Sequence, residues 1–189
     1  MSTFKIAYSC LCFVEFDNEP KKALEYAYGE NFMTYKGINR RDEPFFKGWL
    51  IVDSYVAIYK RDTESASLAC SIDIELENLV VEYYQAKYWS ILLCPLILDQ
   101  KSANRLFTFS ALVGCTTAAR IAQIVLGCTP DGVFGSKSSI PAINNIKTFN
   151  DDFDFVCSLF LRSKAQNNPA LMPNLTGWLN RITKVANYA

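Results

Sequence analysis

Apolar residues recur at the three- and four-residue spacing of amphipathic helices along most of the chain. In residues 3–15 this spacing unites Phe4, Leu11 and Val14 on one face and predicts a first helix. Similar patterns predict helices over 48–60, 75–90, 99–127, 138–145, 150–164 and 176–187. The longest of them should end at Gly127, because Pro130 follows it. The pattern therefore predicts a mainly α protein.

The segment 18–48 departs from this pattern. Prolines and glycines interrupt it repeatedly, and we expect one short helix over 20–27 within an otherwise loop-rich stretch. Loops held by a rigid scaffold often carry binding and catalytic residues, so a cleft is expected at 16–48. A tight turn is predicted at Asp131–Gly135. No repeat or flexible linker divides the chain, which predicts a C-terminal helical lobe that is integral with the rest.

Composition and charge exclude several kinds of site. The 189 residues contain 19 basic and 19 acidic side chains and no histidine. Without histidine the chain cannot build a Ser-His-Asp or Cys-His catalytic group or a histidine-ligated zinc site. Any acid-base chemistry must use Asp, Glu, Lys, Tyr or Cys. The balanced charge also argues against a nucleic-acid binder, which normally carries a basic field.

The seven cysteines are odd in number, lie mostly in apolar sequence and form no C-x-x-C pair. They are typical of free, buried thiols in a protein made in a reducing compartment. Lys5 followed by the apolar 6–14 imitates a signal peptide but lacks a cleavage site. The apolar run 91–98 contains Pro95 and is too short to span a membrane. We therefore expect synthesis in the cytoplasm without a clear signal peptide, and no membrane span.

Glu15 is the sharpest candidate for chemistry. On the first predicted helix it shares the apolar face with Tyr8 and Leu11, and it lies at the helix C-terminus. Desolvation and the negative end of the helix dipole should both raise the pKa of this carboxyl. A carboxylic acid kept protonated in this way is what a general acid requires, as in lysozyme. The alternative is a solvated glutamate where a helix frays into a loop.

Short motifs follow one another in a fixed order along nearly the whole chain. They are Phe4 with Glu15, Thr34-Tyr35-Lys36-Gly37-Ile38, Pro44 with Phe46, Gly48-Trp49, Tyr88-Trp89, Asp99-Gln100, Leu106-Phe107, Asp131–Gly135, Ala142-Ile143-Asn144, Asn168-Pro169 and Gly177–Arg181. In this order they resemble the N-acetylmuramidase or predicted lysozyme family. That family is glycoside hydrolase family 108, of the secretion activator protein type, with a predicted C-terminal peptidoglycan-binding region.

The resemblance implies a lysozyme-like helical fold. Residues 1–100 would form the catalytic lobe, and 101–189 a helical lobe resembling the peptidoglycan-binding region. The protein would cleave peptidoglycan glycan strands between N-acetylmuramic acid and N-acetylglucosamine, with Glu15 as general acid and with no metal ion and no cofactor. Because peptidoglycan lies outside the cytoplasm, delivery would need a phage holin, a contractile injection apparatus or another secretion route.

The remaining site residues are less sharply defined. The implied substrate-binding residues are Thr34, Tyr35, Trp49, Tyr88 and Trp89. Sugars stack on aromatic rings, although rings at helical spacing are often core residues. A second carboxylate could be Asp17 or Asp53, with Asp42 a further option. The sequence does not provide the carboxylate separation that distinguishes inverting from retaining chemistry.

Departures from the family pattern mark a divergent member. Phe16-Asp17 follows Glu15 where the family has two glycines and a tyrosine, and Asn31 and Phe32 replace a second glycine pair. The added bulk is expected to intrude on the cleft and weaken turnover. The alternatives are a catalytically weak or inactive relative that binds cell wall or another protein, and an unrelated helical interaction protein.

Overall fold

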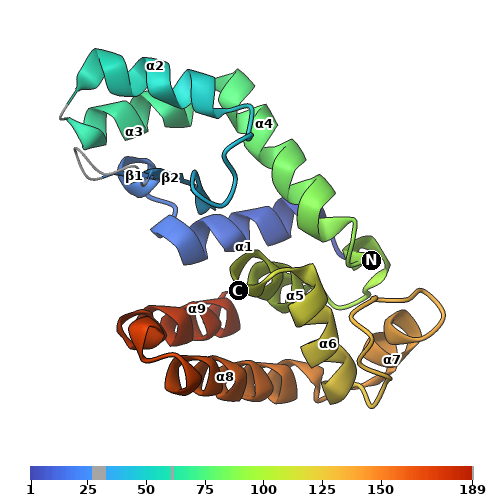
Figure 1. Ribbon diagram of the computed structural model, residues 1–189. Coiled ribbons are helices and arrows are strands. Elements are labelled where there is room, and N and C mark those ends of the chain that lie inside the picture. Colours follow the sequence, from blue (N-terminus) through green and yellow to red (C-terminus); the bar gives the residue numbers. More distant parts are fainter. Residues whose placement is uncertain (27–32, 61, 189) are drawn as a thin grey trace. The chain divides into compact units, whose positions relative to one another are not determined.

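The computed structural model describes residues 1–26, 33–60 and 62–188, and these residues form a mainly α structure (Figure 1). The predicted fold class is confirmed. The chain separates into two compact units. One is Cys12–Tyr84, called here the Glu15 unit, and the other combines Met1–Leu11 with Gln85–Ala189, called here the second unit. These units differ in extent from the expected functional division into 1–100 and 101–189, which stays a prediction.

The Glu15 unit joins a small antiparallel sheet to helices. It contains the end of α1 (Phe4–Phe16), the 3-10 helix η1 (Pro20–Lys22), strands β1 (Leu24–Tyr26), β2 (Met33–Tyr35) and β3 (Ile38–Asn39), and helices α2 (Trp49–Tyr59), α3 (Thr63–Ile72) and α4 (Ile74–Tyr84). The strand order is β1-β2-β3. Helix α3 packs against α2, η1 and β1.

Two elements of the Glu15 unit differ from expectation. The short helix predicted over 20–27 is wrong, because only Pro20–Lys22 is helical and Leu24 begins a strand. Helix α3 was not predicted, since its buried face consists of small side chains such as Ala66 and Cys70, which give a weak hydrophobic pattern. Asp62 begins this helix, and its carboxylate accepts a 3.0 Å hydrogen bond from the Ser65 backbone N–H.

The sheet has one apolar and one polar face. Leu24 of β1 lies opposite Tyr35 of β2, and both side chains are buried. Successive side chains of a strand point to opposite faces, so the next pair, Glu25 opposite Thr34, lies on the other side of the sheet. Strand alternation therefore sets the two polar side chains away from the core.

The second unit is a helical assembly around α5. Its further elements are the π-helical turn η2 (Gln85–Trp89), the 3-10 helix η3 (Cys94–Leu96), α5 (Gln100–Val113), α6 (Cys115–Val125), α7 (Ser139–Asn145), α8 (Phe149–Asn167), the 3-10 helix η4 (Pro169–Asn174) and α9 (Leu175–Asn187). Helix α5 packs against α6, α8 and α9, and its residues 102–110 are all buried.

The single helix predicted over 99–127 is wrong in one respect. It is two helices, because Gly114 takes a φ of +86° and ends α5 before α6 begins. A side chain rarely adopts this conformation, whereas glycine does so at little cost. The predicted helices over 138–145, 150–164 and 176–187 correspond to α7, α8 and α9.

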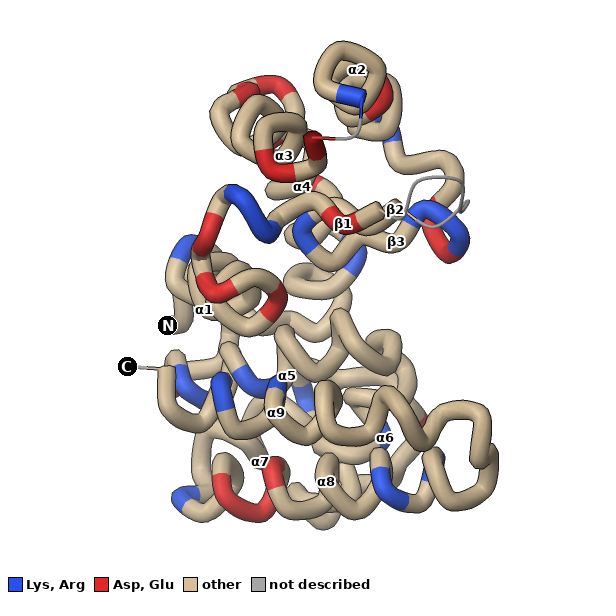
Figure 2. Tube along the Cα trace, turned by 90° about the vertical axis from the view of Figure 1, so that its left-hand side faces the viewer, with Lys and Arg blue, Asp and Glu red and all other residues tan. Residues whose placement is uncertain are grey.

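Charge is distributed unevenly between the units. Acidic side chains outnumber basic ones in the Glu15 unit, and basic side chains outnumber acidic ones in the second unit (Figure 2). The zero net charge of the chain is therefore the sum of a negative net charge on the Glu15 unit and a positive net charge on the second unit. Across the described ranges, no helix combines the length and apolar character needed to cross a membrane.

Candidate functional site

Glu15 lies in the last turn of α1 and is half-buried. The helix ends just beyond it because Asp17 and Asn18 both take left-handed backbone conformations, with φ of +59° and +57°. The Asp17 backbone N–H still donates a 3.0 Å hydrogen bond to the Phe13 carbonyl, so the last turn around Glu15 is closed. The carboxyl group therefore stands on a defined helix end.

The turn between β2 and β3 presses against this carboxyl. Lys36 and Gly37 form a two-residue hairpin turn with φ of +47° and +85°, the pair of positive values typical of a type I′ turn. A Cβ atom added to Gly37 would lie 3.0 Å from Glu15 Cδ and 2.9 Å from the Tyr84 hydroxyl oxygen. Glycine is thus required both by the backbone conformation and by the approach to Glu15.

Helix α4 holds this turn at two points. The Tyr84 hydroxyl donates a 2.7 Å hydrogen bond to the Lys36 carbonyl. Two helical turns earlier, Glu77 forms an ion pair with the ammonium group of Lys36. Lys36 is only 8% exposed, whereas the Glu77 side chain is 35% exposed, so solvent is excluded from the lysine side of this ion pair only. The backbone beside Glu15 is consequently fixed by α4.

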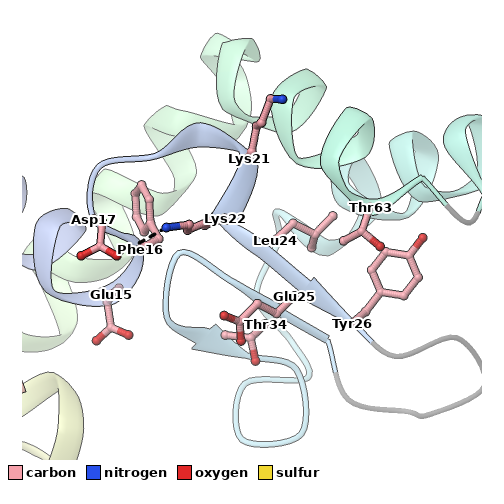
Figure 3. Close-up of a pocket in the computed structure, with 10 residues that line it drawn as sticks. All are labelled: Glu15, Phe16, Asp17, Lys21, Lys22, Leu24, Glu25, Tyr26, Thr34 and Thr63. Carbon is pink, nitrogen blue, oxygen red and sulfur yellow. Dashed lines mark ion pairs between the residues drawn. The ribbon is translucent and has the colours of Figure 1, made fainter. Parts of the chain in front are cut away.

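A cavity of about 680 Å³ opens next to Glu15 (Figure 3). Its lining residues are Glu15, Phe16, Asp17, Lys21, Lys22, Leu24, Glu25, Tyr26, Thr34 and Thr63. Figure 3 shows the carboxyl groups of Glu15 and Glu25 and the side chain of Thr34 in the lower part of the view. The polar face of the sheet and the end of α1 therefore contribute oxygen atoms to the same cavity.

Glu25 was not singled out from the sequence. Its signal is the cross-strand pairing with Thr34, which can be recognised only if β1 is predicted to be a strand. A helix over 20–27 hides that signal, because helical spacing relates Glu25 to residues three and four positions away instead. The error in secondary structure thus caused the omission of a site residue.

The two predicted second carboxylates lie in different places. Asp17 lines the same cavity as Glu15, and its carboxylate lies 3.7 Å from the Lys22 ammonium. Asp53 is on α2, pairs with Arg40 at 2.7 Å and lines a separate cavity of about 850 Å³ together with Trp49. The structure therefore brings Asp17, and not Asp53, into the cavity beside Glu15.

The predicted aromatic substrate residues are largely buried. Tyr35 is fully buried in the core of the Glu15 unit, and burial raises the pKa of its hydroxyl far above the ordinary value. Trp49 is 5% exposed, donates a 2.7 Å hydrogen bond to the Glu43 carbonyl and is covered by Arg40, whose guanidinium lies 4.5 Å from the ring centroid. Neither ring lines the cavity beside Glu15, whereas Thr34 does.

Tyr88 and Trp89 belong to the second unit, in the π-helical turn, and both are buried. Trp89 makes edge contacts with Phe4 and Phe107, with ring centroids 5.7 Å and 5.6 Å away. In this unit Trp89 is a core residue. Phe4, the first residue of the expected motif, thereby helps to anchor the start of the helix that carries Glu15 at its other end.

Phe16 is one of the bulky residues expected to intrude on the cleft. Phe16 is 8% exposed, and the Lys36 ammonium lies 5.8 Å from its ring centroid. Figure 3 shows the Phe16 ring and the Glu15 carboxyl pointing in different directions. Phe16 forms part of the cavity wall but does not cover the acid. Asn31 and Phe32 lie outside the described residues.

The Asp131–Gly135 motif of the second unit bends at Gly132, and the Val133 backbone N–H donates a 2.8 Å hydrogen bond to the Asp131 carboxylate, as in an Asx-turn. The buried Gln123 amide donates to the Asp131 carboxylate at 2.7 Å and to the Val133 carbonyl at 3.0 Å, and accepts from the Gly132 N–H at 2.9 Å. Gly132 has a φ of +84°. The polar groups of this motif are therefore occupied by hydrogen bonds that stabilise its own conformation.

Comparisons with known proteins identify the fold. No family model matches the chain, and no curated protein matches its sequence. Among solved structures, the chain is similar to the structure of Brucella abortus SagA, with a TM-score of 0.62 and 16% sequence identity. The match covers 96% of this chain and 90% of the SagA chain. At this identity the two chains share a fold over nearly their whole lengths.

Proposed function

We propose that the protein is a muramidase that cleaves peptidoglycan glycan strands, with Glu15 as the general acid. One observation carries this proposal: a half-buried carboxyl at a helix end lies against the Gly37 backbone and lines a cavity bordered by polar side chains of a sheet. The fold shared with SagA accords with the sequence resemblance to secretion activator proteins.

In this reaction Glu15 donates its proton to the glycosidic oxygen as the bond to the anomeric carbon breaks. The Gly37 backbone packs against the carboxyl group and limits the orientations that Glu15 can take. A fixed orientation matters because a displacement of about 1 Å between reacting groups can cost a hundredfold in rate.

The second unit would bind the wall. Its excess of basic side chains suits the carboxylates of peptidoglycan peptide stems, since opposite charges attract at long range. Peptidoglycan lies outside the cytoplasm, so the protein would be made inside the cell and delivered by a holin, an injection apparatus or another secretion route. No metal ion or cofactor enters this mechanism.

A second candidate function is wall binding with weak or no catalysis. The burial of Tyr35 and Trp49 favours it, because these rings offer little surface on which a sugar could stack. The retained Glu15 site favours catalysis instead. The two functions differ in whether purified walls are cleaved or only bound.

The test measures the clearing of purified peptidoglycan and the new reducing ends that glycan cleavage creates. Glu15→Gln should lower the rate about 10²- to 10⁴-fold, because an amide cannot donate a proton as a carboxylic acid does. Glu82→Gln, at an exposed position of α4, is the matched control and should keep parental activity. A parent protein that sediments with walls without cleaving them would establish the second function.

A further inference from the structure

Three polar side chains form a row across the sheet in the Glu15 unit. Thr34 in the central strand lies opposite Glu25 of β1 on one side and opposite Asn39 of β3 on the other. Residues directly opposite in neighbouring antiparallel strands have adjacent side chains. The row therefore runs from Asn39 through Thr34 to Glu25, of which the last two line the cavity beside Glu15.

The hydroxyl of Thr34 has a defined orientation. Asn39 Nδ2 donates a 3.1 Å hydrogen bond to Thr34 Oγ1. Exchanging the oxygen and nitrogen positions of the Asn39 amide would lose a hydrogen bond, because Asn39 Oδ1 accepts a 2.9 Å hydrogen bond from the Arg41 backbone N–H. Since Thr34 Oγ1 accepts from Asn39, its own proton is available to donate elsewhere.

Glu25 supplies the complementary group. Within the described part of the chain it has no ion-pair partner, and its side chain is exposed at the cavity. A carboxylate accepts hydrogen bonds and can accept a proton. A hydroxyl and a carboxylate that lie side by side can bind one water molecule together. The hydroxyl donates a hydrogen bond to the water oxygen, and the carboxylate accepts a hydrogen bond from the water.

We propose that Thr34 and Glu25 hold and activate the water that attacks the sugar, with Asn39 as a positioning residue; this inference rests on the proposed muramidase function. The water oxygen bonds to the anomeric carbon and its proton passes to the Glu25 carboxylate. The bond from the anomeric carbon to the glycosidic oxygen breaks, and its electron pair stays on that oxygen, which takes the proton of Glu15. Direct attack by water inverts the anomeric configuration.

The first test is the configuration of the product. Proton NMR of a freshly cleaved, soluble N-acetylglucosamine–N-acetylmuramic acid oligomer, recorded before mutarotation, should show the inverted anomer. A product with retained configuration would overturn the inference while leaving the muramidase function in place. A parent protein that cleaves no glycan would overturn both, so the two failures are distinguishable.

The second test uses three variants on the same oligomer. Glu25→Gln should lower kcat about 10²- to 10⁴-fold, while the control Glu82→Gln stays at the parental value. Thr34→Val keeps the shape but removes the hydroxyl, and it should lower kcat with little change in KM. Equal activity of parent and Glu25→Gln would exclude Glu25 as the base.

Asn39→Asp tests the positioning role. The replacement keeps the acceptor for the Arg41 N–H but replaces the Nδ2 donor by an oxygen, which draws the Thr34 proton toward position 39 and away from the water. We expect kcat to fall about tenfold or more with KM unchanged, and the thermal midpoint to stay close to that of the parent. An unchanged kcat would exclude the orientation of Thr34 by Asn39.

Discussion

The Tyr84 hydroxyl donates a 2.7 Å hydrogen bond to the Lys36 carbonyl and so ties the end of α4 to the turn beside Glu15. The same hydroxyl oxygen lies 2.9 Å from the position that a Cβ atom on Gly37 would occupy. The Tyr84 hydroxyl thus stabilises the turn and also leaves no room for a side chain at position 37. The sequence motif Thr34–Ile38 has its physical basis in this arrangement.

Gly37→Ala should reduce both stability and activity. The residue has a φ of +85°, and the new methyl group would meet Glu15 Cδ at 3.0 Å. We expect a loss of about 1 kcal/mol or more in the free energy of unfolding, and a larger proportional loss in wall clearing, because the acid is displaced. Gly177→Ala in α9 is the control, since nothing lies within 4 Å of its added Cβ. It should be neutral or stabilising, and equal effects of the two changes in urea unfolding would refute the argument.

Tyr84→Phe should loosen the turn without removing the ring. The lost hydrogen bond leaves the Lys36 carbonyl buried without this donor, which costs about 1–3 kcal/mol. Activity should fall as well, because Gly37 no longer holds Glu15 firmly. The control Tyr59→Phe changes a partly exposed side chain of α2 and should have little effect on unfolding or activity. If the activity of Tyr84→Phe equals that of the parent, the turn does not need the hydrogen bond from α4.

The acid dependence of stability should include a contribution from Asp131. The Val133 backbone N–H and the Gln123 amide donate to this carboxylate and hold its pKa below the ordinary value. A lowered folded-state pKa means that the stabilisation is present above the unfolded pKa, about 3.9, and is lost as pH falls through the folded value. Asp131→Asn should remove this part of the acid dependence. Denaturant unfolding of both proteins from neutral pH to below pH 3 measures it, and parallel pH curves would contradict the prediction.

The cysteines should be free and mostly unreactive in the native protein. All seven are thiols and not disulfides in the structure, and Cys10, Cys12, Cys70, Cys94 and Cys157 are buried. Burial raises the pKa of Cys70 to about 12, so almost none of it is the reactive thiolate at pH 8. Thiol titration should find seven thiols after denaturation and few before it. Disulfides recovered from thiol-blocked protein would contradict this prediction.

Much of the fold could be predicted from local sequence patterns. Helices α1, α2, α8 and α9 bury one face, and their apolar residues repeat at helical spacing, a pattern that can be recognised without knowing the tertiary structure. Glu15 could be found for the same reason, because its place at a helix end depends on nearby residues alone. Helix α3 and the break at Gly114 were missed, since small buried residues and a single glycine give weak local signals.

The surroundings of Glu15 depend on contacts between residues that are distant in sequence. The pairing of Glu25 with Thr34, and the approach of Gly37 and Tyr84 to Glu15, follow from strand register and from the packing of α4. A shift of one residue in that register would turn Thr34 into the core and Tyr35 outward. The sequence by itself determined most of the helices and the candidate acid. Only the tertiary structure decided which carboxylate shares its cavity, because the energies that select one register come from burial of whole faces and not from local residue preference.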